Sequence, residues 1–218
     1  MSEDSAPFEP QDDRSHDDGL LLPPWERRDR FGFLNALYLT VKDVLTAPGR
    51  FFHRMPSQVG VLQPLLFALV LGALGTFIAW LYSLVSTSLQ MAIFGDLDSS
   101  QSLQLFLIFL FSPLLVSVGI FVQAALTHGV LALLGGNRLG FEATFRVAAY
   151  SEAASLLLII PICGSAIALI WSLVILIMGL HNIHETEPWK AVVAVLAPLV
   201  VCVSAIGGIF VLAFASFS

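Results

Sequence analysis

Long apolar runs fill most of the chain after residue 62, and charged residues fall mainly between them. A helix rises about 1.5 Å per residue, so about 20 apolar residues cross a hydrocarbon core of about 30 Å. The pattern predicts five spans, at about residues 65–85, 105–134, 143–160, 165–180 and 191–215. We therefore expect an all-α integral membrane protein, with a five-helix transmembrane bundle in residues 62–218.

The third and fourth runs leave one alternative open. Residues Pro161 to Gly164 separate them, and the fourth run, Ser165 to Leu180, is short for a span. Either the two runs are full spans joined by a tight outer hairpin, which we favour, or residues 141–180 form one broken, partly re-entrant element. Arg146 lies inside the third run, and we expect its side chain to extend toward the inner headgroups.

Residues 31–61, ahead of the first run, predict an amphipathic interfacial segment on the cytoplasmic side. The apolar residues at spacings of three and four, which share one helical face, are Phe31, Leu34, Tyr38, Val41 and Leu45. Such a helix lies in the membrane interface or packs against the bundle, and the two placements are compatible. Four aromatic and basic residues follow as a candidate interfacial anchor: Arg50, Phe51, Phe52 and Arg54.

The lysines and arginines indicate which side of the membrane each segment faces. The six segments separated by the five runs hold 7, 0, 2, 0, 1 and 0 of these residues in chain order. Basic loops are retained on the cytoplasmic side, because moving such charges across the bilayer is unfavourable. The alternation predicts five crossings, a cytoplasmic N-terminus and an external C-terminus.

Composition and charge support a membrane protein with a polar tail. Hydrophobic residues make up 57% of the chain and charged residues 12%, far from the roughly 25% charged residues of soluble domains. Residues 1–18 hold seven acidic side chains and one arginine. We expect residues 1–30 to be a disordered tail, first acidic and then basic, because so few apolar groups cannot offset the entropy of ordering.

Polar side chains inside the apolar runs are the candidate functional residues, since such groups are unfavourable in hydrocarbon. His128 in the second run and Glu152 in the third are expected at a similar depth, as a candidate intramembrane polar pair. With Gln123 they would serve a small transporter or channel that relays protons or binds a cation. The favoured alternative is a hydrogen-bonded pair that fixes helix register, because the outer halves of these helices carry almost no polar groups.

A second polar cluster ends the fourth run. His181, His184 and Glu185 share one helical face, a spacing that suits a divalent metal, and Glu187 follows. A zinc-protease pattern needs a further histidine where Pro188 stands, so we interpret the cluster as a solvated helix end. We predict no catalytic residue, metal or cofactor, and hence no enzyme. Nucleic acid is not expected as a partner, because the basic residues are few and close to the membrane.

Several short stretches carry a family resemblance through their order and spacing. They are Ala47–Phe52, Leu134–Gly136, Thr144–Tyr150, Ile160–Gly164, Trp171, Gly179–Leu180 and Lys190–Ala191. Together they resemble the Yip family, the Ypt/Rab-interacting membrane proteins, and particularly its prokaryotic branch. The resemblance implies a five-span bundle with a cytoplasmic N-terminus, in the inner membrane of a bacterium.

The same resemblance bears on function. Eukaryotic members bind prenylated small GTPases and act in vesicle traffic or membrane shaping. This chain lacks the Asp-Leu-Tyr-Gly-Pro segment of those members, so the resemblance gives little support for small GTPase binding here. We expect a non-enzymatic membrane-organising or adaptor protein, whose partners are the lipid bilayer and a protein bound at the cytoplasmic N-terminal segment.

Overall fold

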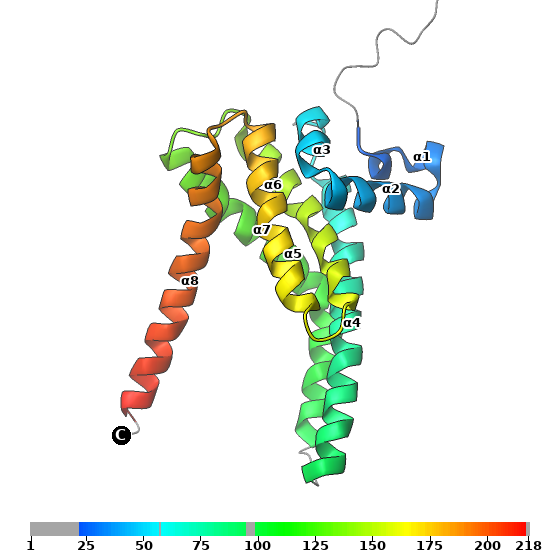
Figure 1. Cartoon of the computed structure of the whole chain (residues 1–218), viewed down its shortest axis with the longest axis vertical. Coiled ribbons are helices and arrows are strands. Elements are labelled where there is room, and N and C mark those ends of the chain that lie inside the picture. The colour runs from blue at the N-terminus through cyan, green and yellow to red at the C-terminus, as the bar shows by residue number, and fades with distance from the viewer. Residues whose placement is uncertain (1–21, 57, 95–98, 217–218) are drawn as a thin grey trace, which may run out of the picture.

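The computed structural model describes residues 22–56, 58–94 and 99–216, and its regular elements there are all helical (Figure 1). Residues 22–56, which we call the N-terminal layer, hold η1 (Pro24–Arg27), α1 (Arg28–Phe31), α2 (Phe33–Thr46) and α3 (Pro48–Arg54). The bundle that follows consists of α4 (Leu62–Phe94), α5 (Ser99–Leu133), α6 (Gly140–Ser151), η2 (Glu152–Ile159), α7 (Gly164–Ile183) and α8 (Pro188–Ser216). The all-α class is confirmed.

Four of the described helices are long and apolar enough to cross a membrane. The qualifying segments are Leu62–Leu89, Phe106–Leu133, Gly164–Ile183 and Pro188–Ala205, in α4, α5, α7 and α8. The predicted third span, residues 143–160, falls on the shorter elements α6 and η2. The fifth crossing therefore stays a prediction.

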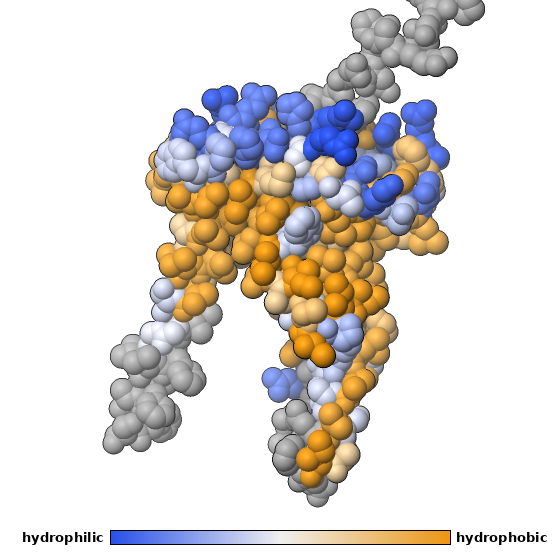
Figure 2. All heavy atoms as spheres, viewed as in Figure 1, coloured by the Kyte–Doolittle hydropathy of each residue, from blue (hydrophilic) through white to orange (hydrophobic). Residues whose placement is uncertain are grey.

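The N-terminal layer covers one end of the bundle, which we call the capped end. In Figure 1 α2 lies across the bundle near the beginning of α4, and α3 stands beside α7. Hydrophilic residues gather at this end, and the bundle beyond it is mainly hydrophobic (Figure 2). Residues 24–30, expected in the disordered tail, are instead helical, because Trp25 anchors them; residues 1–21 lie outside the described residues.

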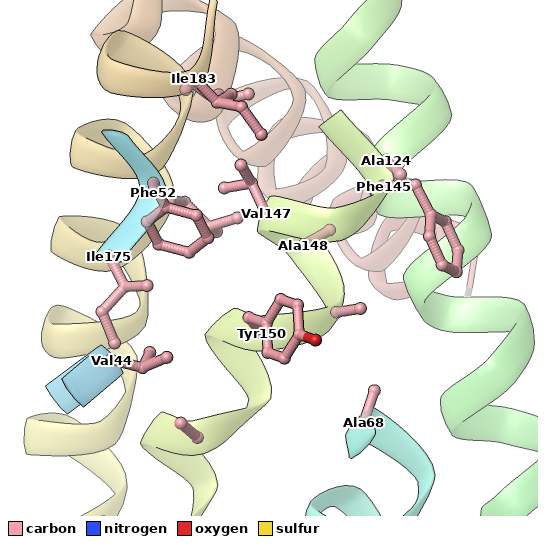
Figure 3. Close-up of a cluster of buried hydrophobic side chains, with 14 of the residues drawn as sticks. Val44, Phe52, Ala68, Ala124, Phe145, Val147, Ala148, Tyr150, Ile175 and Ile183 are labelled. Carbon is pink, nitrogen blue, oxygen red and sulfur yellow. The ribbon is translucent and has the colours of Figure 1, made fainter. Parts of the chain in front are cut away.

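α6 is the central helix of the capped end. Its nine residues from Ala143 to Ser151 are all buried, because α4, α5 and α7 contact it from different sides. In Figure 3 Phe145 lies beside α5, and Val147 lies toward Phe52 of α3. After Ser151 the helix continues in the tighter 3-10 form of η2. The contacts on all sides therefore bury the polar side chains of Thr144, Arg146 and Ser151 together with the apolar ones.

Glycines bring the helices of the bundle close together. A Cβ atom built on Gly72 of α4 would lie 2.7 Å from Cγ1 of Val116 in α5. One on Gly75, a turn further along α4, would lie 2.9 Å from Cβ of Ser155 in η2. The Ser155 hydroxyl donates to the carbonyl oxygen of Leu71 at 3.0 Å, so the small residues also permit a direct interhelical hydrogen bond.

α6, η2 and α7 form a hairpin that stops before the far ends of α4, α5 and α8 (Figure 1). Near its turn the Tyr82 hydroxyl of α4 donates to the carbonyl oxygen of Ile159 at 2.8 Å. Tyr82 lies about 30 Å along α4 from Leu62, at about 1.5 Å per residue. The turn of the hairpin therefore lies beside α4 at about 30 Å from the beginning of that helix, and the crossing by residues 143–160 stays a prediction.

Candidate functional site

Trp25 anchors the N-terminal layer in the bundle. Its side chain is fully buried, and its backbone N–H donates to Oγ1 of Thr40 at 2.8 Å. The indole Nε1–H donates to the carbonyl oxygen of Gln63 at 2.8 Å, at the beginning of α4. The ring also meets Phe67 edge-on with centroids 5.7 Å apart, and the guanidinium of Arg28 lies 4.2 Å from the Trp25 ring centroid. One residue thus joins η1, α2 and α4.

A buried ion pair adjoins this anchor. Glu26 of η1 pairs with Arg146 of α6, and the two side chains are 3% and 0% exposed. The Tyr150 hydroxyl donates to the same Glu26 oxygen at 2.6 Å, and Nη1 of Arg146 donates to the carbonyl oxygen of Gly60 at 3.0 Å. Charge-assisted bonds of this kind strengthen when water is excluded. The network therefore fixes the N-terminal layer to the central helix.

Glu142 completes the junction from the next turn of α6. Its Oε1 accepts hydrogen bonds from the backbone N–H groups of Val59 and Gly60, at 2.7 and 2.5 Å. Gly60 has φ +97°, a conformation that favours glycine. Glu142 and Arg146, four residues apart on one helical face, thus hold the segment that connects α3 to α4.

The expected position of Arg146 was wrong. Its guanidinium does not extend to the headgroups, because Glu26 neutralises it inside the protein. The sequence analysis missed this network, although one signal was present: Arg146 and Tyr150 are spaced i, i+4 within an apolar run. Their partner Glu26 stands among arginines and is 120 residues away, so no local pattern identifies it.

His128 lies in a second polar chain at the capped end. The Leu139 N–H donates to Nδ1 of His184 at 3.3 Å, so neutral His184 carries its proton on Nε2. That Nε2–H donates to Oγ1 of Thr144 at 2.9 Å, and the Thr144 hydroxyl donates to Nδ1 of His128 at 2.9 Å. Burial, followed by the nearby His128, lowers the pKa of His184 to about 4. The chain connects α5, α6 and the end of α7.

Glu152 has different neighbours from His128. It lines a cavity of about 230 Å³ together with Gln123 of α5, Ser155 of η2 and Ser172 of α7. The structure thus brings two of the three predicted transport residues together, while His128 bonds to Thr144. Carboxylate, amide and hydroxyl oxygens in one cavity are ligands suited to a proton or a hard cation.

The candidate anchor residues of α3 divide between two environments. Phe52 is fully buried and packs against Gly179 of α7, where a built Cβ atom would lie 3.0 Å from the Phe52 ring. Phe51 is half-buried and meets Tyr150 edge-on, with centroids 5.2 Å apart. Arg50 and Arg54 are exposed. The aromatic residues therefore contribute packing, and the basic ones remain available at the surface.

The cluster at the end of α7 is only partly solvated, which corrects the sequence interpretation. His184 is fully buried because it bonds to Leu139 and Thr144, whereas Glu185 and Glu187 are exposed. Nδ1 of His181 bonds to the backbone oxygen of Thr186 at 2.5 Å. Across the described residues, no group of three or more histidine, cysteine or acidic side chains is placed to hold a metal ion.

These features define a multi-pass membrane protein whose N-terminal layer is docked on a helical bundle. The Yip1 domain matches residues 42–209, and the chain belongs to the Yip1 domain family. The family resemblance seen in the sequence is thereby confirmed. The match begins within α2, near its end, and continues into α8, so it includes Arg146 but not Glu26. Neither the curated proteins nor the solved structures contain a match.

Proposed function

We propose that this protein is a non-enzymatic membrane-organising or adaptor protein that acts through its N-terminal layer. The observation that carries the proposal is the docking of that layer by Trp25 and the Glu26–Arg146 pair. A segment held by a buried ion pair keeps a fixed orientation, because separating the charges would leave one of them buried without a partner. The layer therefore presents a defined surface to the membrane or to a bound protein.

That surface has an apolar edge on α2. Phe33, Leu34 and Tyr38 are 51%, 76% and 64% exposed, while Val41 and Val44 on the same helix are buried. An apolar edge beside basic side chains suits the boundary between headgroups and acyl chains. Insertion of this edge into one leaflet would hold the layer on the membrane and increase the area of that leaflet.

The basic residues support a cytoplasmic position for the capped end. Of the lysines and arginines in the described residues, six belong to the N-terminal layer, Arg138 and Lys190 lie in or near the loops at the same end, and Arg146 is buried in α6. Positive charge concentrated at one end favours its retention inside the cell. The inner membrane of a bacterium and an external C-terminus are part of this proposal.

Accessible cysteines test the orientation. We would replace Cys163 and Cys202 and then introduce single cysteines at Ser99, Asn137, Glu187 and the C-terminus. We expect the cysteines at positions 137 and 187 to be labelled only from the cytoplasm. We expect those at position 99 and at the C-terminus to be labelled only from outside. An external Glu187 would exclude the five-span topology and restore the re-entrant alternative for residues 141–180.

The membrane-organising role is tested with exposed residues, so that folding is preserved. Purified full-length protein should deform liposomes, and Leu34→Ser with Tyr38→Ser should abolish that deformation. Phe33 is left unchanged because its ring meets the Trp25 ring edge-on, with centroids 5.4 Å apart. Val200→Ser with Val201→Ser, at exposed positions of α8, is the matched control and should keep it. Deformation, or capture of a protein partner, that survives both the α2 substitutions and deletion of residues 1–56 would refute the proposal.

The cavity that holds Gln123 and Glu152 supports a second candidate function, a small transporter or channel. His128 belongs to that hypothesis through the sequence but bonds to Thr144. Protein in liposomes should then pass protons or cations at a rate that falls with Glu152→Gln. If there is no flux, or if Glu152→Gln leaves the flux unchanged, the transporter or channel function is refuted.

A further inference from the structure

A cleft of about 220 Å³ opens on the N-terminal layer between η1, α2 and α3. Arg27 lines it from η1, Asp43 from α2, and Phe51, Arg50 and Arg54 from α3. Three guanidinium groups therefore face one cleft, and Asp43 is the carboxylate that the described residues contribute to its lining. The cleft has an excess of positive charge that a bound anion would neutralise.

Arg27 is held in a position that leaves a donor unused. Its guanidinium lies over the Phe31 ring, with Cζ 5.3 Å from the centroid, which restricts the side chain. Its Nε–H is buried and has no hydrogen-bond partner within the described residues. Buried donors are nearly always paired. Nε of Arg146 is also unpaired but does not line the cleft, whereas Arg27 does, so an acceptor that enters the cleft could bind the Arg27 guanidinium.

Arg50 and Arg54 add a second indication. They are spaced i, i+4 and therefore project from the same face of α3, where like charges repel. Both side chains line the cleft and both are exposed, so they remain accessible to a ligand. An anion between them would replace repulsion with two attractions.

We infer that this cleft binds a phosphate group, carried by an anionic lipid headgroup or by a soluble phosphate ester. Guanidinium groups bind the oxygens of phosphate through paired hydrogen bonds. The cleft has three guanidinium groups and one carboxylate, that of Asp43, so its positive charge is not balanced within the lining. The lipid source rests on the proposed function, because it requires the N-terminal layer to lie at the membrane surface. Recognition of a soluble phosphate ester does not.

The experiment measures ligand retention by the full-length protein in an uncharged detergent, using native mass spectrometry. The probes are phosphatidylglycerol, phosphatidylcholine and glycerol 3-phosphate. We expect phosphatidylglycerol to bind, and Arg27→Gln or the pair Arg50→Gln and Arg54→Gln to weaken its apparent affinity at least tenfold. Asp43→Asn should strengthen binding, and Arg138→Gln, at an exposed arginine outside the cleft, should leave it unchanged.

The probes separate the two sources. Retention of phosphatidylglycerol alone assigns the cleft to lipid, and comparable arginine-dependent retention of glycerol 3-phosphate assigns it to soluble esters. Equal retention of phosphatidylglycerol and phosphatidylcholine overturns the inference. An affinity that is unchanged by substitution of Arg27, Arg50 and Arg54 overturns it too. So does binding that arises only after deletion of residues 2–18, because the acidic tail would then be the occupant. Liposome deformation lost through α2 substitutions tests the proposed function separately.

Discussion

The capped end and the opposite, open end of the bundle bury their apolar surface in different ways. At the capped end Phe52, Tyr150 and Leu180 are fully buried among helices of the same chain. Toward the open end Val85, Phe111 and Val201 are 67%, 53% and 66% exposed. In Figures 1 and 2 α8 diverges there from the α4–α5 pair, and the described side chains along the diverging helices are largely hydrophobic.

The difference shows which part of the bundle depends on specific contacts between side chains. In lipid, apolar side chains gain little from contact with each other rather than with acyl chains, so helix association depends on close packing and polar contacts. The glycine contacts at Gly136 and Gly179 and the Glu26–Arg146 network lie at the capped end. The open end leaves its apolar faces to lipid.

Removal of the Glu26 carboxylate should have the largest effect on this contrast. Glu26→Ala leaves the Arg146 guanidinium buried without its counter-ion, which lowers the free energy of unfolding by about 3–5 kcal/mol. Unfolding by sodium dodecyl sulfate in mixed micelles, followed by circular dichroism, measures the change.

Two variants control the Glu26 experiment. Glu185→Ala breaks the exposed pair with Arg138, whose side chains are 66% and 73% exposed, and should change stability by less than about 1 kcal/mol. The double change Glu26→Met and Arg146→Met should recover much of the loss, since no unpaired charge remains. Equal effects of Glu26→Ala and Glu185→Ala would contradict the assignment of a buried pair.

Overpacking at Gly179 should have the next largest effect. A Cβ atom there would lie 2.5 Å from Cγ1 of Val147 and 3.0 Å from the Phe52 ring, so α3 or α6 must move away from α7. Gly179→Ala is expected to lower the free energy of unfolding by about 1–3 kcal/mol. Gly129→Ala in α5 is the matched control, because nothing lies within 4 Å of its built Cβ atom. The same loss in both variants would contradict the assignment to close packing, because alanine favours a helix more than glycine does and Gly129 has no neighbour to clash with.

Much of the fold follows from the apolar pattern. Pro48 follows the amphipathic run of residues 31–45, and α2 ends at Thr46, because proline disfavours helix in the preceding residue. The predicted first span, residues 65–85, lies inside α4. Apolar runs specify these elements, since a membrane helix must satisfy its backbone internally along its whole length.

What the pattern did not predict depends on tertiary contacts. The change from α6 to η2 at Glu152 leaves no mark on the apolar pattern, because both helix types carry apolar residues there. The docking of Glu26 onto Arg146 joins residues 120 positions apart, and local spacing has no information at that range. His184 was assigned to solvent because its neighbours are polar, yet the fold places it beside Thr144.

Acidification should weaken the capped end by a smaller amount. The lowered pKa of His184, about 4 against 6.5 in the unfolded chain, favours the neutral folded form. Above pH 6.5 His184 is neutral in both the folded and the unfolded chain, so it does not favour unfolding. As pH falls from 6.5 toward 4, the unfolded chain binds a proton at His184 that the folded chain does not, and the free energy of unfolding decreases. Between pH 7 and 5.5 the free energy of unfolding should fall by about 1 kcal/mol. Unfolding titrations at both pH values measure this change, and the slope should flatten in His184→Asn. An unchanged slope in that variant would assign the pH dependence to another group.

Loss of the hydrogen bond near the hairpin turn should have the smallest effect. The Tyr82 hydroxyl bonds to the carbonyl oxygen of Ile159, and Tyr82 is 42% exposed. Tyr82→Phe removes that donor and should lower the free energy of unfolding by about 0.5–1 kcal/mol, the range of single hydrogen bonds in membrane bundles. Tyr38→Phe is the matched control at an exposed tyrosine of α2, for which the described residues provide no hydrogen bond, and it should have no effect. A larger loss for Tyr82→Phe than for Gly179→Ala would invert the contrast, because the turn toward the open end would then contribute more to the fold than the close packing of α3, α6 and α7.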